Sequence, residues 1–251
     1  MKNDFQNPGA QFPSLVPCEV HVWKVSLQAP LDFLPNFFET LSAEEQERAK
    51  RFVFERDEHR YIVAHAALRY LLSNYMSRNP KEIQIAAESL GKPYIHEVNM
   101  RTQLHFNLSH SGEFAAMAFC AGGELGIDIE QRRPEAASME IAERNFSASE
   151  LRELKKLSGE DFVAGFFRCW TRKEAYVKAK GIGLGADLRS FAVTLASDEV
   201  AELTAIDAEK WNVFPFKVTP ENWGAVVCPK SLRNIKLWEL NAQNILGARG
   251  A

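Results

Sequence analysis

The 251-residue sequence has few cysteines, and they show none of the spacings that hold zinc. Its four cysteines, Cys18, Cys120, Cys169 and Cys228, are widely scattered and form no CxxC pair. This distribution argues against a disulfide framework and a zinc site, and it predicts buried free thiols in a reducing cytosol.

Long apolar runs are also missing. The first 17 residues are rich in proline, asparagine and glutamine and contain no apolar segment typical of a secretory signal. No later segment approaches the roughly 18 uninterrupted apolar residues of a membrane-spanning helix. We therefore expect a cytoplasmic protein.

Neither sign of charge is in large excess. The chain has 30 Lys and Arg against 33 Asp and Glu, a formal net charge of −3. No global field would draw it to nucleic acid or to a membrane, so any basic partner site must be local. The sequence also lacks a P-loop and a kinase glycine-rich loop, which excludes a standard ATP-dependent enzyme.

What the chain does contain is enough apolar sequence for a substantial core. Hydrophobic residues make up 46% and charged residues 25% of the sequence, which is typical of a soluble globular protein. The length allows one large domain or two small ones.

Predicted elements recur in a related order in the two halves of the chain. A capping box at Ser42–Glu45 opens a helical segment, and apolar spacing predicts a buried helix over 60–76. A second capping box at Ser147–Glu150 precedes the predicted helix FFRCWTRKEAYVKAKG. Strands are predicted at 19–27, at 190–196, 213–218, 224–228 and 235–240, and on both sides of a break around Ser109–Gly112.

This order predicts an α/β (α+β) fold, a pseudo-dimer of two similar αβ halves with the active site between them. The halves are expected to join at the glycine pair ending at Gly123, which gives a first half of residues 1–123 and a second half of 124–251. Little sequence identity accompanies the shared order of elements.

The stretch ELGIDIEQ (124–131) places two carboxylates on one face of a predicted strand. Apolar and charged residues alternate, so Ile127 and Ile129 point to one face and Asp128 and Glu130 to the other. Two like charges about 7 Å apart repel each other, and strand formation requires neither of them.

A third carboxylate lies on the predicted helix of the second half. Trp170, Glu174 and Lys178 fall on one stripe, at positions i, i+4 and i+8. A surface Glu–Lys pair worth a few tenths of a kcal/mol is the simpler interpretation. The neighbours Phe167 and Val177 instead indicate a partly buried stripe, where a charge needs a partner or a metal.

Two carboxylates from a strand and one from a helix suit a hard, oxygen-seeking cation. Mg²⁺ takes few protein carboxylates and completes its coordination with water and substrate phosphates. Lys178 would then face phosphate oxygens. We therefore expect phosphoryl-type transfer, in which a metal and a lysine stabilise charge on a diphosphate.

Two further stretches could complete an anion site. FNLSHS (106–111) places Ser109 and His110 at the predicted strand break, where hydroxyl, imidazole and backbone N–H groups can bind phosphate. LGKPYI (90–95) is a turn with Lys92 at its tip. A lone histidine is more often structural, and that interpretation holds for the other five, which are His21, His59, His65, His96 and His105.

Taken together, LGKPYI, FNLSHS, GIDIE and WTRKEAYVKAKG closely resemble the motifs of the Sfp/Gsp-type 4'-phosphopantetheinyl transferases. The resemblance spans roughly residues 42–195, and GIDIE followed by WxxKEAxxK is its most specific part. Such enzymes move the phosphopantetheine arm of coenzyme A (CoA) onto a serine of an apo acyl or peptidyl carrier protein. They release adenosine 3',5'-bisphosphate and depend on Mg²⁺, although Mn²⁺ is open.

The resemblance implies a role for each motif residue. Asp128, Glu130 and Glu174 would hold the metal, with Glu174 also the general base, directly or through water. Lys178 would contact the CoA phosphate and neutralise or protonate the leaving phosphate. The other implied CoA contacts are Arg48, Lys92, Asn107, Ser109 and His110, with Arg48 on the 3'-phosphate and Lys92 at the adenine nucleotide.

Glu45 departs from the family pattern, since several relatives have lysine there. Arg51 and Arg60 are alternative contacts for the 3'-phosphate.

The segment from Arg168 to Lys180 holds five basic residues against Glu174 alone. Lys173 and Lys180 share a helical face distinct from the Glu174–Lys178 stripe. This pattern is typical of a solvated flank, or of a docking edge for an acidic partner, and the resemblance implies acidic carrier proteins.

Two other functions stay open at this point: another Mg²⁺-dependent enzyme acting on CoA or a nucleotide diphosphate, and an inactive homologue that only binds carriers. Short relatives build their site between subunits. Both halves occur in one chain here, so a monomer is expected. The carrier could belong to fatty-acid, polyketide or nonribosomal-peptide synthesis.

Overall fold

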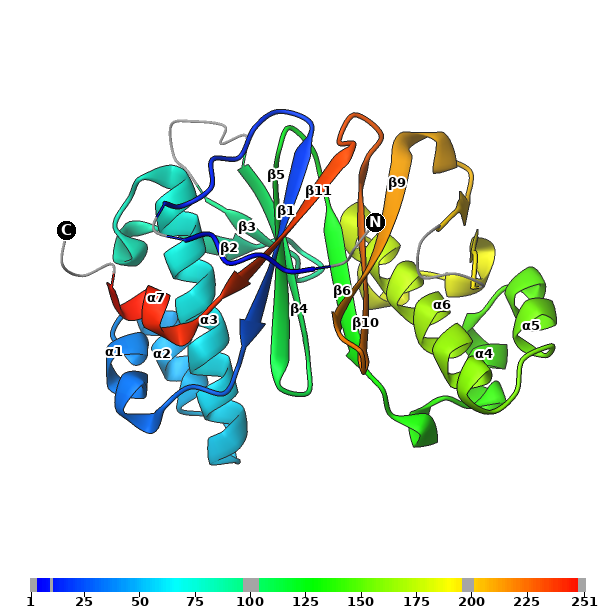
Figure 1. Ribbon diagram of the computed structural model, residues 1–251, viewed down its shortest axis with the longest axis horizontal. Helices are drawn as coiled ribbons and strands as arrows, with labels where there is room; N and C mark the ends of the chain where they lie inside the picture. The colour runs from blue at the N-terminus through cyan, green and yellow to red at the C-terminus, as the bar shows by residue number, and fades with distance from the viewer. Residues whose placement is uncertain (1–3, 10, 97–103, 196–200, 248–251) are drawn as a thin grey trace.

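The computed structural model describes residues 4–9, 11–96, 104–195 and 201–247. Helices cover the outer faces of two central β-sheets, giving four layers (Figure 1). The helices of residues 1–123 lie on one side of the molecule, together with the last helix at Ala242–Gly247, and the helices of residues 139–180 lie on the other. The predicted α/β architecture of two similar halves is therefore confirmed.

The first sheet has four strands in the order β11-β1-β5-β4. Neighbours pair antiparallel except β1 and β11, which run parallel in the register Val22 to Leu237. The strands are β1 (Glu19–Ser26), β4 (Leu104–Ser111), β5 (Phe114–Ala121) and β11 (Asn234–Leu240).

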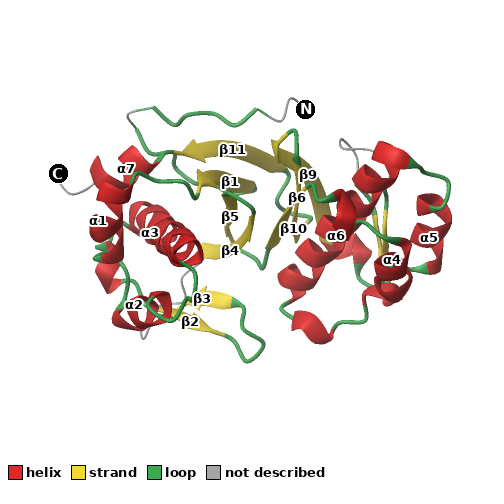
Figure 2. Ribbon diagram, turned by 90° about the horizontal axis from the view of Figure 1, so that it is seen from below, coloured by secondary structure: helices red, strands yellow, loops and turns green. Residues whose placement is uncertain are grey.

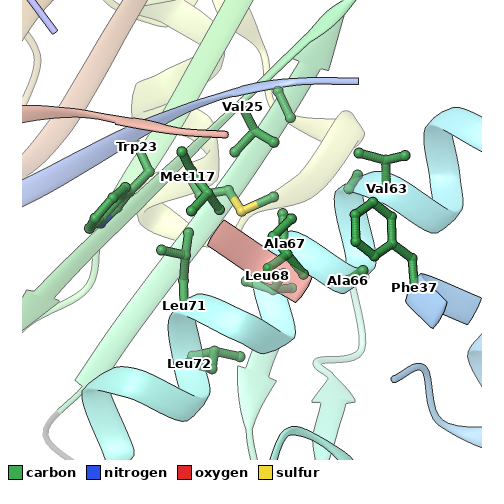
Figure 3. Packing of buried hydrophobic residues seen from close by; sticks show 14 of the residues in the cluster. Trp23, Val25, Phe37, Val63, Ala66, Ala67, Leu68, Leu71, Leu72 and Met117 are labelled. Atoms are coloured by element: carbon green, nitrogen blue, oxygen red, sulfur yellow. The ribbon is translucent and has the colours of Figure 1, made fainter. Parts of the chain in front are cut away.

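Helix α3 (Glu55–Met76) forms the main core of the first half by packing on this sheet. It buries Leu68 and Leu71 against Trp23 of β1 and Met117 of β5 (Figure 3). Burying each such side chain contributes about 1.5–3 kcal/mol. The shorter helices on this side of the molecule are α1 (Leu34–Phe38), α2 (Ala43–Ala49) and α7 (Ala242–Gly247), the last of which follows β11 in sequence.

The second sheet has three antiparallel strands in the order β6-β10-β9, and helix α6 (Gly159–Lys180) covers it. A Cβ atom at Gly126 would collide with the backbone of α6 at Ala175 and Ala179, so glycine allows the helix to lie directly on β6. The other elements of this layer are β6 (Gly126–Gln131), β9 (Trp211–Thr219), β10 (Asn222–Pro229), α4 (Met139–Asn145) and α5 (Ala148–Leu154).

The two sheets face each other across a shared apolar layer. Val22 of β1 and Ala118 of β5 pack here with Ile127 and Ile129 of β6. Two small antiparallel pairs lie outside the sheets, and they are β2 (Ile85–Ala87) with β3 (Pro93–Ile95), and β7 (Ala192–Val193) with β8 (Leu203–Thr204).

Each half uses its predicted capping box in the same way. Ser42 and Glu45 bond reciprocally at the start of α2, and Ser147 and Glu150 do so at the start of α5. In each half the same glutamate also pairs with a buried base of the long helix. Glu45 accepts from Arg69 at 2.5 Å, and Glu150 accepts from Lys173 at 2.8 Å.

We expect Glu45→Gln to destabilise the protein by about 3 kcal/mol at neutral pH, and the loss to vanish in acid. Burial alone would raise the pKa of Glu45, but hydrogen bonds from His65 and Arg69 outweigh it and lower the pKa from 4.5 to about 2. Because the pKa of Glu45 is lower in the folded state, the ionised carboxylate stabilises the fold at pH values above its unfolded pKa. This stabilisation fades as the pH falls from about 4.5 to about 2. Urea unfolding across that range measures it.

The exposed neighbour Glu44 supplies the control, because its side chain lies at the surface and Glu44→Gln should change stability little. An equal loss of stability in both variants at every pH would contradict a role for the Glu45 ion pair.

Several outcomes of the sequence predictions concern the fold. All four cysteines are free thiols, but Cys18 is exposed, so the prediction of buried thiols is wrong for that residue. The predicted strand 190–196 is only Ala192–Val193, and residue 196 lies outside the described residues. Within the described part of the chain, no helix is long and apolar enough to cross a membrane.

The division of the chain into two halves at residue 123 stays a prediction. One strand crosses between the halves. Strand β11 follows the second half in sequence but joins the sheet of the first half through β1.

Candidate active site

Side chains of β4 bond to β6 and join the edges of the two sheets. Side chains at every second position of β4 point toward β6, and they are Asn107, Ser109 and Ser111. The Asn107 side chain accepts a hydrogen bond from the Ile127 backbone N–H at 3.0 Å. This seam between the halves places the acidic stretch of β6 at their junction.

Asp128 is buried at the centre of the seam, with 4% of its surface exposed. Its Oδ1 accepts from the Ser109 hydroxyl at 2.9 Å and from the Lys178 ammonium at 2.7 Å. Its Oδ2 is buried and has no hydrogen-bond partner among the residues that the structure describes. Burial raises the pKa of Asp128, although the bonds from Lys178 and Ser109 act in the opposite direction.

Glu130 lies two residues further along β6, on the same side as Asp128. Both side chains line one cavity, as the period-two pattern predicted. Glu130 accepts from the Ser111 hydroxyl at 2.8 Å and from Arg133 at 3.2 Å. Burial and then the negative charge of Asp128 raise the pKa of Glu130.

Helix α6 brings Glu174 and Lys178 to the same junction. Burial, then the charges of Asp128 and Glu130, raise the pKa of Glu174, so the three carboxylates are close enough to repel one another. Lys178 bonds Asp128 and not Glu174. Glu174 is half-buried next to Trp170 on the wall of a cavity, which confirms the predicted partly buried stripe.

Among the described residues, no three His, Cys, Asp or Glu side chains are already placed as a group that could hold a metal ion. Asp128 and Glu130 are instead bonded to side chains of β4, α6 and the segment after β6.

A large cavity of about 1320 Å³ opens between the halves beside the carboxylates. Its walls come from α2, α3, the β2–β3 hairpin and β4 in the first half, and from β6 and α6 in the second half. Arg48, Arg51 and Arg60 line it, and none has an ion-pair partner among the described residues. The cavity therefore suits an anion that extends from these arginines to Lys178.

Several relatives have lysine at the position of Glu45, and a glutamate there would be expected to repel an anion in this cavity. The structure shows a different role for Glu45. Its carboxylate turns inward to the Ser42 N–H, His65 and Arg69. Above it, Tyr61 stacks on His65 at 4.0 Å between ring centroids, and Arg48 lies over Tyr61 at 5.5 Å. Glu45 is therefore a structural residue of this wall.

The prediction of a strand break at Ser109 and His110 is wrong. Strand β4 continues to Ser111, and these two residues pair with Ala116 and Ala115 of β5. They therefore lie within a continuous strand and not in a turn. The His110 side chain still lines the large cavity, and burial followed by the charges of Lys178, His65 and Arg60 lowers its pKa.

The surroundings of the Lys92 side chain also differ from the expected ones. Its ammonium group bonds the carboxylate of Glu124 at 2.5 Å and the carbonyl oxygen of Ala179 at 3.2 Å, and its side chain is 8% exposed. The turn that carries Lys92 lines a second cavity, of about 450 Å³. This smaller cavity has an apolar wall from Trp170, Val177 and Leu188 and reaches Glu174 and Lys178.

The predicted docking edge on α6 is wrong for Lys173. That side chain is completely buried, bonds Glu150 at 2.8 and 2.9 Å and the Phe191 carbonyl at 2.7 Å, and lies over the Phe191 ring. Arg172 is also buried. Lys180 bonds Asp207 at 3.0 Å. The basic segment therefore presents no row of free cations.

Sequence reasoning did not single out Ser111 or Arg133, which both bond Glu130. A signal for Ser111 was present in the alternation of Asn107, Ser109 and Ser111, because period two places all three on one face of a strand. This signal was missed because a strand break was expected around these residues.

Comparison with known proteins agrees with this geometry. A model of the 4'-phosphopantetheinyl transferase superfamily matches residues 124–228, and a model of the N-terminal part of 4'-phosphopantetheinyl transferase matches residues 29–121. The two matches meet at the junction of the halves.

Individual relatives cover most of the chain. The 4'-phosphopantetheinyl transferase HetI of Nostoc sp. is 36% identical over 195 residues, which is 78% of this chain and 82% of HetI. Sfp of Bacillus subtilis is 32% identical over 70% of this chain and 77% of its own. The transferase ffp of Bacillus subtilis is 35% identical over 68% and 72%, respectively.

The chain belongs to the 4'-phosphopantetheinyl transferase superfamily. It is an enzyme that transfers phosphopantetheine to carrier proteins, and the family takes that group from CoA. The resemblance drawn from its motifs is confirmed.

Proposed function

We propose that this enzyme transfers phosphopantetheine from CoA to a serine hydroxyl of an apo acyl or peptidyl carrier protein at the junction of its halves, with release of adenosine 3',5'-bisphosphate. The observation that carries this assignment is the meeting, at Lys178, of a cation-lined cavity and three carboxylates. The cavity suits the nucleotide and its phosphates, and the carboxylates suit the diphosphate chemistry.

The three carboxylates are the proposed ligands of a divalent cation, although among the described residues they are not already grouped around one position. Asp128 Oδ2 is a buried oxygen without a hydrogen bond from any described residue, and burial followed by the charges of Asp128 and Glu130 raises the pKa of Glu174. Oxygen donors of this kind suit Mg²⁺, and Mn²⁺ is an alternative. Asp128, Glu130 and Glu174 would hold the ion. When bound, it would neutralise charge on the diphosphate.

Glu174 is the proposed general base. Its carboxylate and Lys178 both border the smaller cavity, which places a proton acceptor beside the proposed diphosphate site. It would take the proton of the carrier serine, directly or through water, while the serine oxygen forms a bond to the β-phosphorus of CoA. The bond from that phosphorus to the oxygen bridging to the α-phosphate breaks, and Lys178 neutralises the departing phosphate.

The large cavity would hold the nucleotide part of CoA. Arg48, Arg51 and Arg60 are the proposed contacts of the 3'-phosphate, and His110 contacts a phosphate nearer Lys178. A phosphate role for Ser109 would require its hydroxyl to leave Asp128. Asn107 would border the ligand from the smaller cavity.

We expect Arg51→Ala and Arg60→Ala each to raise KM for CoA roughly tenfold or more, since a lost hydrogen bond to a charged group costs about 1.5–3 kcal/mol. KM for dephospho-CoA, which lacks the 3'-phosphate, should hardly change. Steady-state kinetics with both substrates measures the difference. Arg152→Ala, at an exposed position of α5, removes the same charge away from the cavity and is the control. Equal losses with both substrates would refute the 3'-phosphate assignment.

The function itself is tested by mass spectrometry of an apo-carrier protein incubated with the enzyme, CoA and Mg²⁺. Transfer adds the mass of the phosphopantetheine arm to the carrier. A carrier that binds but gains no mass would indicate a binding protein without activity. A panel of apo-carriers from fatty-acid, polyketide and nonribosomal-peptide systems identifies the partner. The monomeric state, the cytoplasmic location and the acidity of the carrier stay predictions.

A further inference from the structure

The large and the small cavity share one wall. Both are lined by Gly91 of the β2–β3 turn, Pro93 of β3, Leu108 of β4 and Lys178 of α6. The hairpin belongs to the first half, and its turn projects toward the side of the molecule that carries α6 (Figure 2). The position of this turn therefore sets the shape of both cavities.

The turn lies against the C-terminal end of α6. A Cβ atom at Gly181 would stand 3.1 Å from the Glu88 carboxylate and 3.7 Å from the Lys92 side chain. A Cβ atom at Gly183 would stand 3.2 Å from Leu90. Both glycines have positive φ, so the chain leaves the helix in a conformation that permits this close approach.

Lys92 makes the polar contacts across this interface. Its ammonium group donates to the Ala179 carbonyl, in the last turn of α6, and to the Glu124 carboxylate. Helix carbonyls near a C-terminus lack intrahelical partners and carry partial negative charge, which favours a cation there. The side chain thus connects the hairpin to the end of the helix that carries Lys178.

Glu124 has a second hydrogen-bond partner besides Lys92. Hydrogen bonding from His105, followed by the bond from Lys92, holds the pKa of Glu124 at about 2. His105 lies on β4 and bonds the second carboxylate oxygen at 3.0 Å. Glu124 does not border either cavity as lined by the described residues, so its effect on a ligand must pass through Lys92.

We infer that Lys92 is a positioning residue, whose ammonium group ties the β2–β3 turn to Glu124 and to the end of α6 and so holds the wall between the two cavities. This inference rests on the proposed function of those cavities in binding CoA. It differs from a direct contact of the Lys92 ammonium with the nucleotide, because that group is already bonded within the protein.

The variant Glu124→Gln separates the two roles by the sign of its effect. If Lys92 holds the wall, losing the carboxylate loosens the turn, and Kd for CoA should rise roughly three- to tenfold. If Lys92 were a direct phosphate ligand, freeing its ammonium would tighten CoA binding. Lys92→Met should weaken binding by a similar factor, and the double variant should be no worse than the worse single variant. Lys92→Arg should restore most of the affinity.

Calorimetric titration with CoA at physiological ionic strength measures the affinities. Lys81→Met and Glu113→Gln are matched controls, because each removes one exposed charge of the same sign away from the wall. Hydrogen exchange supplies a second readout. The amides of Glu88 and Gly91, which bond carbonyls within the turn, should exchange faster in Lys92→Met and Glu124→Gln.

Tighter CoA binding by Glu124→Gln, or unchanged exchange in the turn, would overturn the inference. Additive effects of the two substitutions would overturn it as well. A wild-type enzyme that fails to modify any apo-carrier would instead refute the proposed function, so the two failures are distinguishable.

Discussion

Replacing Asp128 with asparagine should lower kcat/KM for phosphopantetheine transfer by about a thousandfold or more. Asparagine keeps the shape of the side chain and one acceptor for Ser109, but it removes the negative charge paired with Lys178. It also removes the charged oxygen that is proposed to ligate the cation. Steady-state kinetics over a range of Mg²⁺ concentrations measures both effects.

The same substitution should not lower the melting temperature. The Asp128 carboxylate is buried, one of its oxygens has no hydrogen bond within the described part of the chain, and burial raises its pKa, so its charge is a cost to the fold. Asp161→Asn, at an exposed carboxylate in the first turn of α6, is the control and should leave activity unchanged. An Asp128→Asn enzyme within a few-fold of wild type would remove the proposed cation site.

Lys178→Met should lower kcat about a hundredfold or more, with a smaller change in KM for CoA. The expected reason is the loss of an ammonium group that borders both cavities and contacts Asp128. Charge on the departing phosphate grows in the transition state, so the loss falls mainly on kcat. Single-turnover kinetics with saturating CoA isolates this step.

Lys180→Met is the matched control for Lys178. It removes a lysine two residues further along α6 that pairs with Asp207 away from the cavities. Lys178→Arg keeps the charge and should recover part of kcat. Because Lys178→Met leaves Asp128 without its cation, thermal unfolding of all three variants is needed to separate lost stability from lost catalysis. Equal kcat losses in Lys178→Met and Lys180→Met would contradict a role for Lys178 in the chemistry.

Local chemistry explains which parts of the fold were predictable. The capping boxes at Ser42 and Ser147 follow from contacts within four residues, and both form as expected. The alternation in 124–131 fixes the shared face of Asp128 and Glu130 in the same way. The helix stripe of Glu174 and Lys178 follows from helical geometry alone.

Contacts between distant segments were not predictable from these patterns. Lys173 was expected at the surface because its buried partner, Glu150, lies 23 residues away in another helix. The role of Glu45 depends on Arg69, 24 residues further on. The expected break in β4 placed turn-forming serines where their hydroxyls in fact bond β6. In each case a long-range polar partner decided the outcome.

The parallel pairing of β11 with β1 has a consequence for synthesis of the chain. As the protein leaves the ribosome, β1 emerges early, but its neighbour on one side emerges only with residues 234–240. The sheet of the nascent first half therefore keeps an open edge until residues 234–240 have been made. A premature stop before residue 234 would thus harm the first half, although the missing residues follow the second sheet in sequence.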